Sequence, residues 1–137
     1  MEQTIEIGLG KTVDLAFDQA MERVEELLVG EGFGVMTRID LSGTLKQKLG
    51  VEHPRTWILG ACHPACAHEA LTAAPEVSLM LPCNVVVKEL DAGKTRVDVI
   101  NARSMAIFFP GVEAVAKKVA VRLDRVLDAL GSPVRPR

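Results

Sequence analysis

Two cysteines and two histidines lie within seven positions of the segment LGACHPACAHEAL, residues 59–71. Cys62, His63, Cys66 and His68 are residue types that bind soft metal ions or take part in nucleophilic and acid–base chemistry. The C-x3-C spacing fits the first half of a structural zinc site, which then needs a second pair of ligands. It fits neither a haem attachment site, C-x-x-C-H, nor a thioredoxin-type C-x-x-C motif. Three interpretations stay open: metal ligands, a reactive thiol, or cysteines that pack as small hydrophobic residues.

This cluster is expected at a turn from a strand into a helix. Pro64 is typical of the first position of a helix, so Cys62 would end a strand, His63 would lie at the N-cap and Cys66 in the first turn. The N–H groups at a helix start carry partial positive charge, which favours the thiolate form of a nearby cysteine. Cys62 is therefore the candidate nucleophile or metal ligand, with Cys66 and His63 as further candidate ligands. We expect His68 on the helix surface, because it lies two positions from Cys66 and so points to a different face of the helix.

A third cysteine, Cys83, stands before the apolar run NVVVKEL, residues 84–90. If the strands expected at 56–61 and 84–90 are neighbours, Cys62 and Cys83 would lie side by side at one end of a sheet. The pair could line a pocket for a small ligand, or bind a thiophilic ion such as zinc or copper. The alternative is that Cys83 is a buried structural residue.

The elements that must position these residues follow from apolar periodicity. Strands are predicted at 3–9, 33–39, 56–61, 84–90 and 95–101. Helices are predicted up to Gly30 with Thr12 or Asp14 as cap, over 43–49 with Asp40 or Ser42 as cap, from Pro64 to about Ala73, and over 112–130. Residues 75–81 fit either a helical turn or a strand.

These elements predict an α+β fold. It is a two-layer sandwich in which about four helices, the last one long, cover one face of a mainly antiparallel sheet of about five strands. We expect a single domain over residues 1–130 and a flexible tail over 131–137. The uncovered sheet face would be rich in Val and Ile and would need a cover, which predicts a homodimer.

Composition excludes several classes of function. Of the 137 residues, 48% are hydrophobic and 25% charged, with a net charge of −2, so no excess of positive charge indicates nucleic acid or anionic lipid as a partner. No apolar stretch is long enough to span a membrane. The sequence MEQTIEIGLG is not typical of a signal peptide. We therefore expect a cytoplasmic protein whose three cysteines are reduced.

Three segments resemble the Domain of Unknown Function 302 family of small bacterial and archaeal proteins. They are GEGFGVMTRIDLSGTLKQKLG, WILGACHPACAHEAL and LMLPCNVVVKE, and the resemblance extends from about residue 12 to residue 130. It implies a compact α+β domain, commonly a dimer, with no assigned activity. The family pattern carries cysteines at positions 62 and 83, together with the residues Pro64, Pro82 and Asn84.

The resemblance strengthens Cys62 and Cys83 as a candidate pair and adds Asn84 as a candidate ligand-binding residue. The chain departs from the family at His63, where asparagine is usual, and at Asn101-Ala102, where Asp-Pro is usual. The first hypothesis is thus a homodimeric binding module with a thiol-lined pocket. The second is a thiol-dependent enzyme or redox sensor that uses Cys62, and the third is a structural protein whose cysteines only pack.

Overall fold

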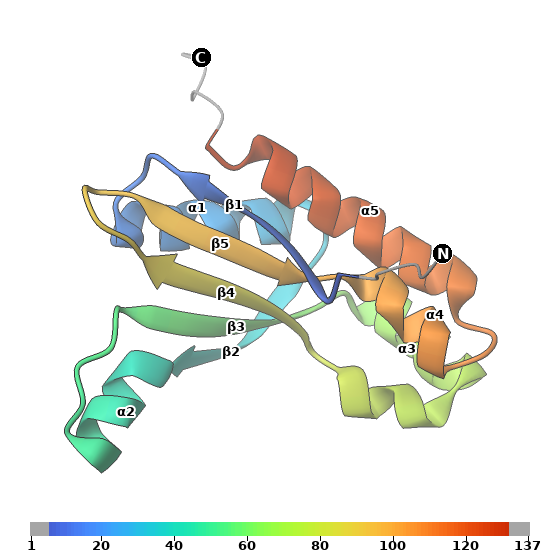
Figure 1. The fold of residues 1–137 in the computed structure, drawn as a ribbon. Helices are drawn as coiled ribbons and strands as arrows, with labels where there is room; N and C mark the ends of the chain where they lie inside the picture. Colours follow the sequence, from blue (N-terminus) through green and yellow to red (C-terminus); the bar gives the residue numbers. More distant parts are fainter. Residues whose placement is uncertain (1–5, 132–137) are drawn as a thin grey trace, which may run out of the picture.

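The computed structural model describes residues 6–131. Within these residues, a five-stranded antiparallel sheet forms one layer of the protein (Figure 1). The spatial order is β1-β5-β4-β3-β2, and every neighbouring pair is antiparallel. The strands are β1 (Gly8–Val13), β2 (Gly34–Asp40), β3 (Thr56–Cys62), β4 (Cys83–Glu89) and β5 (Thr95–Ile100). The predicted hairpin of β4 and β5 is confirmed, with Val85 opposite Val99 and Val87 opposite Val97.

Helices cover one face of this sheet, so the predicted α+β sandwich with a long last helix is confirmed. The α-helices are α1 (Phe17–Gly30), α2 (Leu41–Leu49), α3 (Pro64–Ala73), α4 (Met105–Phe108) and α5 (Glu113–Ala129). Two 3-10 helices, η1 (Pro75–Met80) and η2 (Ala102–Ser104), complete the described elements. No helix among the described residues is long and apolar enough to cross a membrane.

The core lies between the helices and the inner face of the sheet. Along β4 and β5 every second side chain is buried, as expected for strands with one covered face. Helix α1 buries a stripe at helical spacing, made of Phe17, Ala20, Val24 and Leu28. Helix α5 buries seven residues against the same sheet: Val115, Ala116, Val119, Ala120, Leu123, Val126 and Leu127. The apolar periodicity of the sequence therefore identifies the true core faces.

The beginning of the chain differs from the prediction. The first strand runs over Gly8–Val13 instead of 3–9, and residues 3–5 lie outside the described part of the chain. Thr12 belongs to β1, so the prediction that Thr12 or Asp14 caps α1 is wrong. The N-cap is Ala16, whose N–H donates to Oε1 of Gln19 at 3.3 Å. Gln19 thus satisfies the N–H of the N-cap residue, which is one half of a capping box, while Ala16 has no side chain that could accept from the first turn.

Helix α2 begins and ends at standard signals. The carboxylate of Asp40 accepts a hydrogen bond from the N–H of Gly43 at 2.8 Å, so Asp40, and not Ser42, is the cap. Gly50 ends the helix in the left-handed region at φ +68°. No residue of α2 is buried, and the helix projects beyond the sheet (Figure 1). Its local capping therefore contributes more to its stability than tertiary packing does.

Two segments are settled only by the fold. Residues 75–81, which fit a helical turn or a strand, form η1. Residues 102–108, for which the sequence predicts no element, form η2 and α4, and they bury Met105 in the core. Of the tail expected over 131–137, only Gly131 is described, and residues 132–137 lie outside the described part of the chain.

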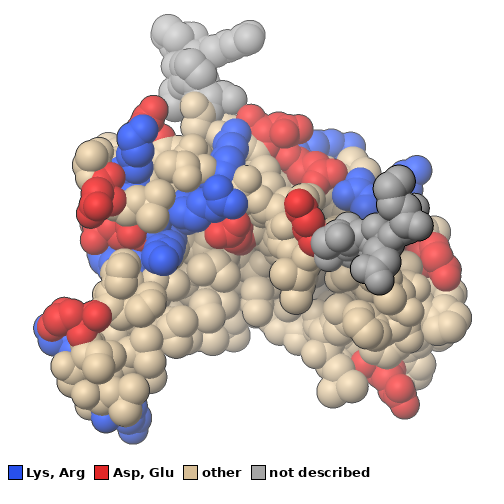
Figure 2. All heavy atoms as spheres, viewed as in Figure 1, with Lys and Arg blue, Asp and Glu red and all other residues tan. Residues whose placement is uncertain are grey.

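The second face of the sheet carries no helix. Its side chains include the half-buried Ile58 and Val86 near the centre and the exposed Ile39 at the β2 edge. The half-buried Lys88, Arg96 and Asp98 lie on the same face along β4 and β5. In Figure 2 the surface is hollowed between α2 and η1, and few charged side chains lie there. This open face is the largest structural feature for which the described residues supply no cover.

Candidate thiol site

The pairing of β3 with β4 brings Cys62 and Cys83 to the same end of the sheet. Ala61 lies directly opposite Cys83, and Cys62 is the next residue of β3. Cys62 also pairs with Gly34 of β2, so it ends β3 between two neighbouring strands. The side chain of Cys83 is buried and that of Cys62 is half-buried. Two residues 21 positions apart in the sequence thus become neighbours because their strands pair.

All three cysteines border one cavity of about 20 Å³. They come from β3, α3 and β4, and the thioether of Met105 in α4 adds a fourth sulfur to the lining. The remaining lining residues are Phe33, Ala61, His63, Ala67, Ala70, Leu81, Val115 and Val119. A cavity of this size holds about one water-sized atom. It has room for a single ion, but it is far too small for the small organic ligand that the sequence left open.

His63 caps helix α3 through its side chain. Its Nδ1 accepts a hydrogen bond from the N–H of Cys66 at 3.2 Å, which confirms the expected N-cap position. The ring also meets Phe33 edge to face, with centroids 5.7 Å apart and planes at 81°. Because Nδ1 accepts this bond, the neutral ring carries its proton on Nε2. The histidine that stands where the family usually has asparagine therefore performs the same capping role.

Burial keeps two of the thiols protonated. Burial raises the pKa of Cys66 above its ordinary value, and this effect outweighs the opposing charge of Arg122. Burial, followed by the neighbouring thiols of Cys62 and Cys66, raises the pKa of Cys83 to about 11. The raised pKa of Cys66 contradicts the expectation that the start of α3 makes this thiol ionise more easily, because desolvation is the largest cause of the shift.

The other candidate residues lie apart from the cavity. Asn84 points to the open face, opposite Gly60, and does not line the cavity. His68 is exposed on α3, as expected. His53 is exposed in the loop before β3, where its Nδ1 donates to the carbonyl of Pro54 at 2.8 Å. Neither histidine is placed to act as a base for Cys62.

The geometry limits the metal chemistry of the site. Across residues 6–131, no group of three or more His, Cys, Asp or Glu side chains is arranged to hold a metal ion. A tetrahedral zinc site needs four such ligands, so the described residues do not form one. Sequence reasoning missed Met105, since nothing in the segment ARSMAIFF distinguishes a cavity-lining thioether from an ordinary core methionine. Only the return of α4 across the end of the sheet identifies it.

Known proteins match both the sequence and the fold. Residues 9–130 match the sequence profile of a family described as Domain of unknown function DUF302. The crystal structure of an uncharacterized conserved DUF302 protein from Bacillus stearothermophilus is similar, with a TM-score of 0.83 and 26% sequence identity. That match covers 92% of this chain and 99% of the other. No curated protein matches this sequence. Residues 9–130 include the thiol cavity and all of the sheet except Gly8, the first residue of β1.

Proposed function

We propose that this chain, which belongs to the DUF302 family, is a homodimeric binding module whose thiol cavity takes one soft metal ion. The observation that carries the proposal is the lining: three cysteines and one methionine border a cavity with room for a single atom. Thiolate and thioether ligands select soft ions, copper(I) above all. Copper(I) also needs fewer ligands than a tetrahedral zinc ion. We therefore place copper(I) before zinc as the ion that this cavity accepts.

Binding must displace protons from the thiols. The ligand form of cysteine is the thiolate, and the pKa of Cys83 of about 11 means that this thiol is neutral at pH 7. An ion held by Cys83 therefore releases at least one proton per ion bound at neutral pH. Its apparent affinity rises about tenfold per pH unit for each proton displaced, until the pH reaches the pKa of the thiol. The same chemistry requires reduced cysteines, which supports a cytoplasmic location.

Copper(I) titration under anaerobic conditions tests the proposal directly. The protein competes with a chromogenic copper(I) chelator, and the expected result is one ion per chain. The double variant Cys62→Ser, Cys83→Ser should lose this binding. Unchanged competition by the double variant, or no competition by the wild-type protein, would remove the proposal.

Methionine variants supply a matched control that keeps the core filled. Met105→Leu conserves volume, so the fold should be retained while the thioether is lost. Copper(I) affinity should then fall, whereas Met21→Leu on α1, away from the cavity, should leave it unchanged. Equal affinities in the two variants would show that Met105 is only a packing residue.

The open face of the sheet supports the homodimer. A large exposed apolar surface marks an interaction site on a soluble protein. A second copy is the occupant that we favour, because a two-fold axis would pair Ile39, Ile58 and Val86 with the same apolar side chains of another copy. Ile39→Glu at the β2 edge should therefore shift the protein toward monomer in native mass spectrometry. Val29→Glu is the matched control, because Val29 is more exposed than Ile39, at 65% against 47%, but lies on the helical layer.

The second candidate function uses Cys62 as a redox-active or nucleophilic thiol. Its support is that Cys62 is half-buried, whereas Cys66 and Cys83 are buried. Peptide mapping after brief alkylation should then show Cys62 labelled well before the other two. Labelling of Cys62 that is no faster than that of a free cysteine would rule this function out.

A further inference from the structure

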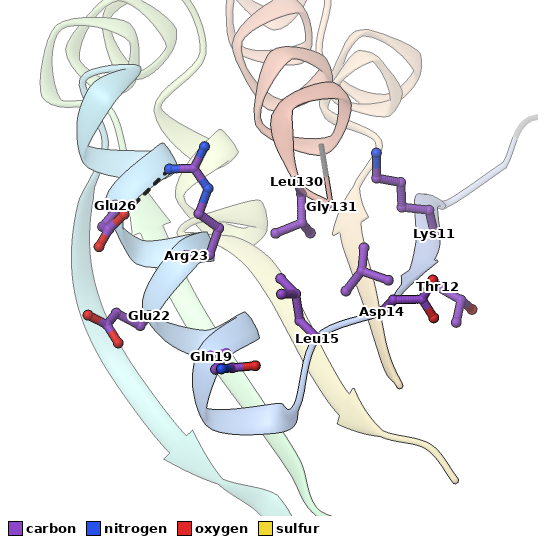
Figure 3. A pocket seen from close by; sticks show the side chains of 11 residues that line it. Lys11, Thr12, Asp14, Leu15, Gln19, Glu22, Arg23, Glu26, Leu130 and Gly131 are labelled. Carbon is purple, nitrogen blue, oxygen red and sulfur yellow. Dashed lines mark hydrogen bonds and ion pairs between the residues drawn. The ribbon is translucent and has the colours of Figure 1, made fainter. Parts of the chain in front are cut away.

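A larger cleft of about 560 Å³ lies at the opposite end of the strands from the thiol cavity. It opens between the end of β1, the first half of α1 and the last turn of α5 (Figure 3). Its volume falls within the range of small-molecule sites in proteins, about 300–1,000 Å³. The cleft is separate from the thiol cavity, and no residue lines both.

The base of the cleft is apolar. Val13 and Leu130 are buried, and Leu15 is half-buried where the chain leaves β1 for α1. These three side chains come from the two ends of the described chain, so the apolar base exists only in the folded protein. A base of this kind favours a ligand with a hydrocarbon body.

Two cationic side chains stand on opposite sides of this base. Lys11 extends from β1 and Arg23 from α1, and in Figure 3 both reach toward the Leu130–Gly131 end of α5. The ammonium of Lys11 has no hydrogen bond or ion pair within the described residues. Arg23 meets only the exposed carboxylate of Glu26, at 3.4 Å. Lys11 is therefore available to an anionic group that enters the cleft, and Arg23 keeps the N–H groups that do not meet Glu26.

The acidic side chains of the cleft are less available. Asp14 pairs with Lys94 at 3.0 Å, and Glu26 pairs with Arg23. Glu22 points away from the base of the cleft in Figure 3. The uncompensated charge that faces the apolar base is thus the positive charge of Lys11.

We propose that this cleft binds a small organic carboxylate with a branched or linear hydrocarbon body. The carboxylate lies between Lys11 and Arg23, where charge-assisted hydrogen bonds favour it. The hydrocarbon part packs on Leu15 and Leu130. An amine or a zwitterion has less complementarity, because Asp14 and Glu26 are already paired and Glu22 points away from the apolar base (Figure 3).

Amide chemical shifts of the full chain test this assignment with three probes that share the same isobutyl group. The probes are 4-methylpentanoate, 3-methylbutylamine and leucine, which present a carboxylate, an amine and both. We expect 4-methylpentanoate to give saturable shifts at residues 11–15, 19–23 and 130–131, and the other two to bind more weakly. Equal or tighter binding of the amine or of leucine would overturn the carboxylate assignment, as would the absence of saturable shifts with 4-methylpentanoate.

A charge variant separates a ligand-binding role from a structural one. Lys11→Met should weaken 4-methylpentanoate binding at least fivefold without moving the thermal midpoint by more than Lys48→Met does. Lys48 is exposed on α2, away from the cleft. The structural alternative is that Lys11 and Arg23 only offset the partial negative charge at the end of α5. Unchanged affinity in Lys11→Met would support that alternative and overturn the proposal.

Discussion

Burial of the Cys83 thiol makes the folded protein less stable at high pH. An unfolded cysteine titrates near its ordinary pKa of 9.0, whereas in the folded protein the pKa of Cys83 is raised to about 11. Between these values the unfolded chain has lost the proton and the folded chain still holds it. Stability therefore decreases as the pH rises through this window, because the folded state binds more protons there.

The size of the effect follows from the shift. One pKa unit corresponds to about 1.4 kcal/mol, so a shift of about two units lowers the free energy of unfolding by about 2–3 kcal/mol between pH 8 and pH 11. This is a large part of the roughly 5–15 kcal/mol that stabilises a typical domain. The loss is complete above pH 11 and absent below pH 8.

Urea unfolding of the wild type and of Cys83→Ala at pH 8 and pH 11 isolates this contribution. Lysines and Cys66 titrate in both proteins, so their effects cancel in the difference between the two. Reductant and a metal chelator exclude oxidation and bound ions. At pH 8 the wild type should be more stable, because Cys83→Ala removes buried volume.

By pH 11 the advantage of the wild type should shrink by about 2–3 kcal/mol and can reverse its sign. A stability difference that stays constant across this range would refute the reasoning. It would mean that Cys83 titrates as an exposed thiol, and that the end of β4 is hydrated in solution.

Three further predictions concern the scaffold. Asp40→Ala should lower the free energy of local opening of α2 by about 1 kcal/mol, which would be seen as roughly fivefold faster amide exchange within that helix. Unchanged exchange would show that the Asp40 cap does not stabilise the helix. Leu59→Ala should lower the free energy of urea unfolding by about 2–5 kcal/mol, while Leu79→Ala at an exposed position should change it by less than about 0.5 kcal/mol. Gly10→Ala places a methyl group 2.5 Å from the carbonyl oxygen of Val97 and should cost about 1–3 kcal/mol, whereas Gly30→Ala meets no neighbour and should lower the thermal midpoint little, if at all.

Local signals predict most of the elements well. Some features depend only on residues close together in the sequence, and each of these is confirmed: the Pro64 start and His63 cap of α3, the glycine end of α2 and the apolar stripe of α5. The start of α1 is not, because Ala16 has no capping side chain and the position of Phe17 in the core decides where that helix begins.

The candidate site was also predictable from the sequence only in part. The residue types at Cys62, Cys66 and Cys83 already indicated soft-atom chemistry, and strand pairing was enough to expect Cys62 beside Cys83. Neither the size of the cavity nor the contribution of Met105 was visible in the sequence, because both depend on how α3 and α4 pack over the end of the sheet.

The sequence alone determined the period-2 and period-3.6 patterns, and with them the α+β layers and the side chains that face the core. Only the tertiary structure decided the protonation of the thiols, the atom-sized cavity and the cleft between β1 and α5. The physical reason is the separation along the sequence between the residues that interact. Periodicity and capping act between residues a few positions apart, whereas burial, desolvation and cavity volume depend on groups brought together from distant parts of the chain.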